Sequence, residues 1–83
     1  DKKWRMVIFD IPENNRKGRD SLRNKLGQLG FYVLQKSTFI FPFECRKEID
    51  FICAFFRVHD NIYYITTDRF DGDEKITKYF GIN

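Results

Sequence analysis

The sequence predicts an α+β fold of the ferredoxin-like type, a βαββαβ sandwich with a short C-terminal helical tail. Four short segments rich in β-branched and aromatic residues alternate with two helical patterns in the order β-α-β-β-α-β. Right-handed crossovers then place the first and third strands centrally and both helices on one face. Aromatic residues make up 18% of the 83 residues. Their side chains carry more apolar surface than a single sheet covered by helices on one face can bury, so we expect a homodimer through the uncovered face of the sheet.

The first expected strand covers residues 4–12. Six of its first eight residues are large and apolar, which is typical of a strand buried on both faces, and Pro12 ends it. Asp10 stands out in this setting. A carboxylate near the end of a central strand is costly to desolvate unless it is hydrogen-bonded, close to water or holding a cation.

A helix follows, for which Asn14 or Asn15 can provide the N-terminal cap and Gly30 the left-handed stop. Gly18 lies on its apolar stripe and would let the helix approach the sheet closely, at a cost in helix propensity. The stripe itself recurs at i, i+4 and i+7 and consists of Leu22, Leu26 and Leu29. This face of the helix is therefore expected in the core.

The opposite face of this helix is basic. Against the single acid Asp20 it carries Arg16, Lys17, Arg19, Arg23 and Lys25. A solvated helix face is the common explanation for such a run. The alternative is that its first residues, Arg16, Lys17 and Arg19, hold phosphates of a nucleic acid by salt-sensitive contacts.

The two middle strands are expected at residues 31–35 and 37–43. The link between them lacks the Asn-Gly or Gly-X pair of a tight hairpin, so we expect a bend or bulge at residues 35–37. Pro42 indicates that the ladder is ending or exposed at that point.

The second helix is expected at residues 45–57. Phe51 and Phe55 start a second apolar stripe on it, and we expect this much apolar surface to be core. The last strand covers residues 62–67, and a brief helix ends before Gly81. The first stripe of the second helix consists of Ile49, Ile52, Cys53 and Phe56, and the brief helix is marked by Ile76, Tyr79 and Phe80.

The bulk composition limits the classes of function. A net charge of +3 and a pI near 9.0 permit binding to an anionic polymer without requiring it. No run reaches the roughly 18 apolar residues of a membrane span, so we expect a soluble cytoplasmic protein. Cys45 and Cys53 are too far apart to bridge and lack zinc-site spacing, which predicts two reduced, packed thiols. The chain begins without Met, so we expect residues 1–83 to be one domain of a longer protein.

Asp10 admits two interpretations. It can cap the loop into the first helix by accepting backbone N–H bonds. Alternatively, it is a ligand for Mg²⁺, or for Mn²⁺, both of which prefer carboxylate oxygens. One carboxylate per chain is a poor site, but a two-fold axis could pair two Asp10 side chains over a shared cation that orients water on a phosphodiester.

Several blocks of the sequence resemble known families. The chain is similar to the CRISPR-associated endonuclease family Cas2 at residues 7–12, at the Arg-rich start of the first helix, and at residues 29–31 and 34–39. It resembles even more closely the Cas2-like central domain of phenylacetate-type (PaaX-like) transcriptional repressors. The blocks that carry this second likeness are residues 9–13, 19–20, 34–37 and 72–74.

The resemblance implies a ferredoxin-like homodimer and two alternative functions. In the CRISPR family, the acid that matches Asp10 is the proposed divalent-metal ligand, and the dimer is a DNA-integration scaffold with an integrase partner. Some members are reported to be endonucleases acting on RNA or DNA, so Asp10 would be catalytic. In the repressor-like relatives, this domain follows a winged-helix DNA-binding domain and resembles a non-catalytic dimerisation or sensing module.

One position and one segment depart from the CRISPR pattern. Ile40 stands where those proteins usually carry an acidic residue, which puts any inherited interaction there in question. The tail from Glu74 to Phe80 is expected to be helical, whereas many CRISPR members exchange a fifth strand between protomers. We therefore expect a Cas2-like dimer associated with nucleic acid and leave its catalytic activity open.

Overall fold

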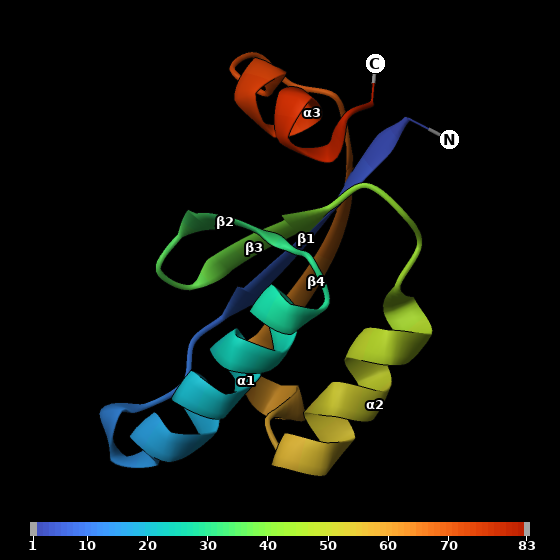
Figure 1. Ribbon diagram of the computed structural model, residues 1–83. Helices are drawn as coiled ribbons and strands as arrows, with labels where there is room; N and C mark the ends of the chain where they lie inside the picture. The colour runs from blue at the N-terminus through green and yellow to red at the C-terminus, as the bar shows by residue number, and fades with distance from the viewer. Residues whose placement is uncertain (1, 83) are drawn as a thin grey trace.

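The computed structural model describes residues 2–82, without the side chains of Glu13 and His59. Within these residues the chain forms a four-stranded sheet and three α-helices (Figure 1). In chain order the elements are β1 (Lys3–Phe9), η1 (Glu13–Asn15), α1 (Arg16–Gln28), β2 (Tyr32–Gln35), β3 (Thr38–Phe41), α2 (Arg46–Phe56), η2 (His59–Asn61), β4 (Ile62–Asp68) and α3 (Glu74–Phe80). Within residues 2–82, no helix has the length and apolar character needed to cross a membrane.

The sheet has the strand order β2-β3-β1-β4, and every neighbouring pair is antiparallel. The predicted central position of the first and third strands is therefore confirmed. The arrangement is α+β and compatible with a ferredoxin-like fold. The expected irregularity between the middle strands lies slightly earlier than predicted, as a register shift between Val33 and Gln35.

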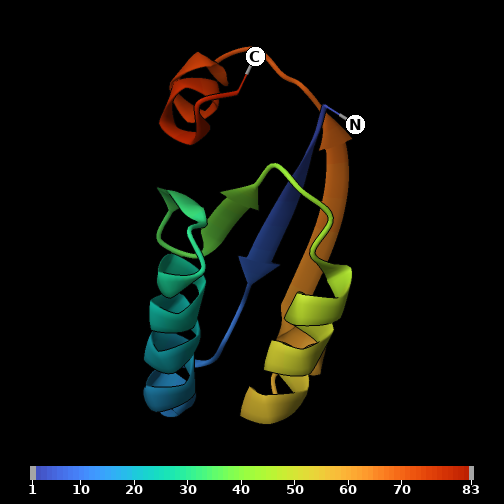
Figure 2. The ribbon, with the colours of Figure 1, turned by 45° about the vertical axis from the view of Figure 1, so that its right-hand side comes forward.

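The main core lies between the sheet and the two helices α1 and α2, which lie side by side on one face (Figure 2). Alternate residues of the central strands, such as Val7, Phe9 and Phe39, face Leu22 and Leu26 of α1 in this core. The α2 residues Ile49, Ile52 and Cys53 complete it, as the helical stripe predicted. Cys45 and Cys53 are both free and buried, which confirms the predicted reduced thiols.

Two predictions about α1 are wrong. Leu29 is exposed, because α1 ends at Gln28 and the chain turns away at Leu29 before it can reach the sheet. Gly18 does not allow a close approach to the sheet. An added Cβ there would instead meet the side chain of Asn15 at 2.7 Å, and Asn15 Oδ1 accepts a hydrogen bond from the Gly18 N–H. Gly18 therefore makes room for the N-cap.

The other face of the sheet is partly covered by α3. Ile76 of α3 packs against Trp4 and Ile40 in a second, smaller core, and all three side chains are buried. We had expected this face to be left entirely to a partner, so the tail helix corrects that expectation. The cluster also gives a physical reason for an apolar residue at position 40, because Ile40 contacts a helix rather than solvent.

The exposed positions of α2 contradict the sequence prediction. We expected Phe51 and Phe55 in the core, but they are 73% and 71% exposed. The stripe of Ile49, Ile52 and Cys53 already fills the space over the sheet, so the second stripe faces outward. The two phenylalanines require another explanation.

Candidate functional site

Asp10 is exposed and follows directly after β1. Its neighbours Phe9 and Ile11 are both buried in the core on the helix side. Because successive side chains of an extended chain point to opposite sides, Asp10 faces away from α1 and α2. Its backbone N–H donates to the carbonyl oxygen of Asn61 at 2.7 Å, which fixes this end of β1 against the start of β4. The carboxylate therefore lies on the surface, exposed to solvent.

Within residues 2–82, no hydrogen bond or ion pair of the Asp10 carboxylate is observed, and Asn15 provides the side-chain cap of α1. The capping interpretation of Asp10 therefore has no support in the geometry. In the same part of the chain, no three His, Cys, Asp or Glu side chains gather where they could hold a metal ion. The Asp10 carboxylate by itself is a poor site for Mg²⁺, which prefers several oxygen ligands.

The three basic residues at the start of α1 are placed differently from one another. Arg16 and Lys17 are exposed in its first turn. Arg19 is half-buried, and its Nε lies 3.7 Å from Oδ1 of Asp20. Arg16 and Lys17 thus reach the solvent at the start of α1, whereas Arg19 lies partly beneath the surface beside an acidic neighbour. No contact joins any of them to Asp10 within the described residues.

The part of the sheet that α3 does not cover forms an apolar patch. We call Met6, Ile8, Tyr63 and Ile65 the open patch. They form two cross-strand pairs, since Ile8 lies opposite Tyr63 and Met6 lies opposite Ile65 in the register of β1 and β4. Tyr63 is 60% exposed and Ile65 42% exposed. The four side chains are neighbours, carry no charge and lie on the same face of the sheet as Asp10. The open patch is therefore the candidate site for contact with a partner.

A buried carboxylate holds α3 in place beside this patch. Oδ2 of Asp73 accepts a hydrogen bond from Nε1 of Trp4 at 2.8 Å, and also one each from Nε of Arg69 and the N–H of Phe70, both at 3.1 Å. The Arg69 guanidinium lies 5.1 Å from the centre of the Trp4 ring. The hydrogen bond from Trp4, followed by those from Phe70 and Arg69, lowers the pKa of Asp73.

This lowered pKa predicts a pH-dependent stability. The ionised Asp73 stabilises the fold above the ordinary pKa range of aspartate, and this contribution is lost as the pH falls through that range towards the lower pKa of the folded chain. We expect Asp73→Asn to destabilise the chain at neutral pH and to differ less from wild type near about pH 3. Urea unfolding at the two pH values measures the difference. Asp71→Asn, at an exposed position in the same turn, is the control, and an equal loss at both pH values would contradict the prediction.

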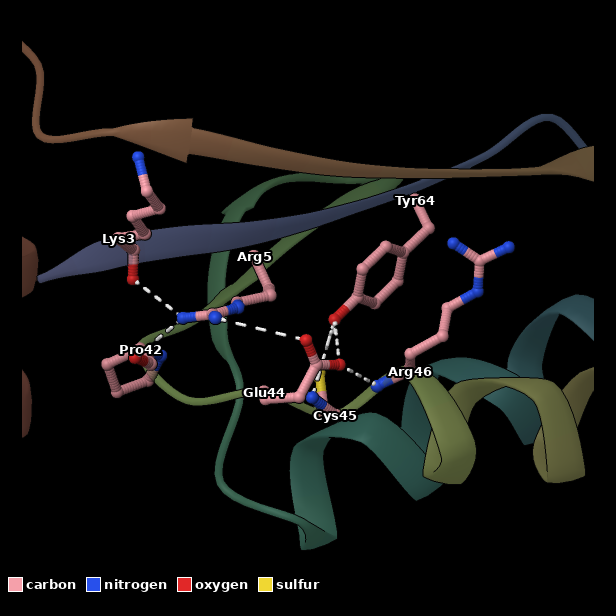
Figure 3. Close-up of polar contacts among 7 residues, drawn as sticks. All are labelled: Lys3, Arg5, Pro42, Glu44, Cys45, Arg46 and Tyr64. Carbon is pink, nitrogen blue, oxygen red and sulfur yellow. Dashed lines mark hydrogen bonds and ion pairs between the residues drawn. The ribbon is translucent and has the colours of Figure 1, made fainter. Parts of the chain in front are cut away.

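A second polar cluster, centred on Arg5, lies on the helix side of the sheet (Figure 3). The Arg5 side chain is only 5% exposed and points to the connection between β3 and α2. Its Nη1 donates to the carbonyl oxygens of Lys3 and Pro42 at 3.3 and 3.4 Å, and its Nη2 lies 3.9 Å from Oε2 of Glu44. Arg5 therefore fixes that connection to β1.

Tyr64 of β4 completes this cluster. Its hydroxyl donates to Oε1 of Glu44 at 3.2 Å and accepts from the N–H of Cys45 at 3.3 Å. The Arg46 N–H donates to the same Glu44 oxygen at 2.7 Å and, with Tyr64 and Arg5, lowers the pKa of Glu44. Burial raises the pKa of the Cys45 thiol and of Tyr64. The hydrogen bonds of this cluster join β1 and β4 to the connection that leads into α2, which is a structural role.

The sequence carries a signal for the burial of Arg5. Side chains alternate along a strand, so Arg5 shares its face with Val7 and Phe9, which are both buried. That period-2 pattern predicts a buried arginine, which in turn requires carbonyl or carboxylate partners. The partners themselves, from the connection between β3 and α2, could not be identified from sequence spacing.

Comparison with known proteins identifies a family. A family model described as the PaaX protein central Cas2-like domain matches residues 1–78. No curated protein and no solved structure matches the chain.

Proposed function

The chain belongs to the family of PaaX central Cas2-like domains, and from this membership we propose that it is the dimerisation module of a PaaX-type transcriptional regulator. The observation that carries the proposal is the open patch. An apolar, uncharged surface on a central strand and an adjacent edge strand is suited to pairing with a second copy of itself across a two-fold axis.

The charge distribution supports a second copy as the occupant of the open patch. Met6, Ile8, Tyr63 and Ile65 carry no charge, so a two-fold contact between two such patches brings no like charges together there. Association would remove the ring of Tyr63 and the branched side chains of Ile8 and Ile65 from contact with water on both protomers, which favours the dimer. In a regulator, such a contact would set the spacing of two attached DNA-binding domains and match it to a two-fold symmetric operator.

Sedimentation equilibrium of the 83-residue chain tests this function. We expect a dimer at micromolar concentration that dissociates on dilution. A monomer at all concentrations, including those well above micromolar, would contradict the proposed function. The substitution that tests the open patch itself is argued in the Discussion.

Asp10 supports a second candidate function, a site for Mg²⁺ or Mn²⁺ at the edge of the dimer. Asp10 is exposed on the side of the sheet that carries the open patch, so a two-fold contact there could bring two copies of it together. A shared cation would relieve the repulsion between the two carboxylates. Bound there, Mg²⁺ would supply the Lewis-acid chemistry of a phosphodiesterase, and Arg16 and Lys17 would bind flanking phosphates of DNA or RNA.

A magnesium titration tests this second function. We expect wild type to bind about one Mg²⁺ per dimer and Asp10→Asn to lose that binding, because the amide cannot supply the negative charge. Isothermal titration calorimetry measures both, with Asp71→Asn as a control that changes charge at an exposed turn on another part of the surface. Identical titrations of wild type and Asp10→Asn would exclude the metal site. Cleavage of a labelled nucleic acid that persists in Asp10→Ala would point to contamination.

A further inference from the structure

The helices α1 and α2 leave an apolar groove between them on the side of the molecule that faces away from the sheet. It consists of two adjoining cavities of about 390 and 260 Å³, both bordered by Lys25, Phe51 and Ile52. We call this the interhelical groove. The other residues that line it are Leu29, Lys47, Glu48, Phe55 and Phe56.

Phe51 and Phe55 are not needed to hold the fold together. They lie at i and i+4 on α2, are 73% and 71% exposed, and belong to neither core. Two exposed phenylalanines one helical turn apart, beside the exposed Leu29, expose a contiguous apolar surface to water. Such surfaces on soluble domains mark contacts with a partner.

The charges at the groove decide between possible partners. Lys25 and Lys47 border it, and Glu48 is the single acid among its lining residues. A second copy docked here through the same surface would bring lysine towards lysine, which disfavours self-association. An acidic partner would instead meet the two ammonium groups.

The shape of the groove favours a helix. Two neighbouring helices present a trough that accepts a third helix by its residues at i, i+4 and i+7. A flat or convex aromatic surface would suit a bilayer or stacked bases, but here Leu29 and Ile52 add aliphatic side chains to the lining beside Phe51. We propose that the interhelical groove binds an amphipathic helix of a partner protein, with aliphatic anchors flanked by carboxylates. This function is additional to the proposed dimer, because the groove and the open patch lie on opposite sides of the sheet.

A designed peptide pair tests the proposal by fluorescence anisotropy. The first probe, the glutamate peptide, is a labelled helical peptide with leucines at i, i+4 and i+7 and glutamates on both sides of this leucine stripe. The second, the lysine peptide, is identical except that lysines replace the glutamates. We expect wild type to bind the glutamate peptide more tightly than the lysine peptide. Replacing both Phe51 and Phe55 by serine should weaken binding of the glutamate peptide by about tenfold or more, because both main anchors of the groove are lost.

Charge reversal provides the second arm of this experiment. Lys25→Glu combined with Lys47→Glu should reverse the preference, so that the lysine peptide binds more tightly than the glutamate peptide. Lys75→Glu, at an exposed position on α3, makes the same change elsewhere and should leave the wild-type preference intact. Far-ultraviolet circular dichroism checks that each variant is folded.

Three results would overturn the proposal. The first is equal binding of the two peptides by wild type, and the second is unchanged binding after loss of both phenylalanines. The third is binding of an oligothymidine or of anionic phosphatidylglycerol vesicles through the same phenylalanines while the peptide does not bind. Sedimentation of the Phe51→Ser, Phe55→Ser variant keeps the two functions separate, because the dimer through the open patch should persist when peptide binding is lost.

Discussion

An aspartate in place of Ile65 is expected to convert the proposed dimer into a monomer. Ile65 belongs to the open patch and lies opposite Met6 in the register of the sheet. In a two-fold contact the substitution would place one unpaired carboxylate from each protomer in an apolar interface. Burying an uncompensated charge costs several kcal/mol, so the dissociation constant of the dimer should rise by about a hundredfold or more.

The neighbouring residue offers a matched control for this experiment. Thr66 is exposed on the same strand but points to the opposite face, where it lies opposite Arg5. Thr66→Asp adds the same charge one residue away and should leave the sedimentation of the dimer unchanged. Ile65 is partly exposed in the protomer, so Ile65→Asp should still fold. A dimer that survives Ile65→Asp would exclude the open patch as the interface.

The order and the layers of the fold could be predicted because periodicity is a local property. Apolar runs, alternation and β-rich composition identified the four strands, and apolar residues at every third and fourth position identified the helices. The errors concern how many apolar positions of a helix reach the core. Leu29 continues the stripe of α1 by spacing, and Phe51 and Phe55 start a second stripe on α2, yet all three are exposed. Periodicity shows which residues share a side of a helix, but the width of the contact depends on the packed neighbour.

The candidate site was predictable only where one residue was chemically out of place. Asp10 could be singled out because a carboxylate interrupts an apolar strand. Asp73 could not be singled out, since nothing local in the sequence distinguishes it from Asp71. Its importance comes from Trp4, which is 69 positions away in the chain. Such a pairing depends on where the tail returns to the sheet, and a single sequence carries no information about that.

Replacing Trp4 by alanine is expected to have the largest effect on stability. Trp4 is fully buried, packs with Ile40 and Ile76, and holds Asp73 through its indole N–H. Truncating a buried tryptophan costs about 3–5 kcal/mol in the free energy of unfolding. A domain of this size has roughly 4–12 kcal/mol in total. We therefore expect Trp4→Ala to be largely unfolded at moderate urea concentrations.

Trp4→Phe separates the hydrogen bond from the packing. Phenylalanine keeps an aromatic ring under the Arg69 guanidinium but cannot donate to Asp73, so this variant should lose less stability than Trp4→Ala. A double-mutant cycle with Asp73→Ala measures the coupling, and we expect the two losses to be less than additive, because Asp73→Ala removes the acceptor and Trp4→Phe the donor of the same hydrogen bond. Additive losses would contradict a direct interaction between the two side chains.

The same variant connects stability to the proposed function. Because α3 covers one end of the face that carries the open patch, loosening the Trp4–Asp73 contact should detach α3 before the rest of the sheet unfolds. Hydrogen exchange of Trp4→Phe should therefore accelerate at the amides of α3 while those of β1 and β3 stay protected. Uniform acceleration in all elements would mean that α3 and the sheet unfold as one unit. In that case α3 would uncover the sheet only when the whole domain unfolds, and it could not by itself change the area available to a partner.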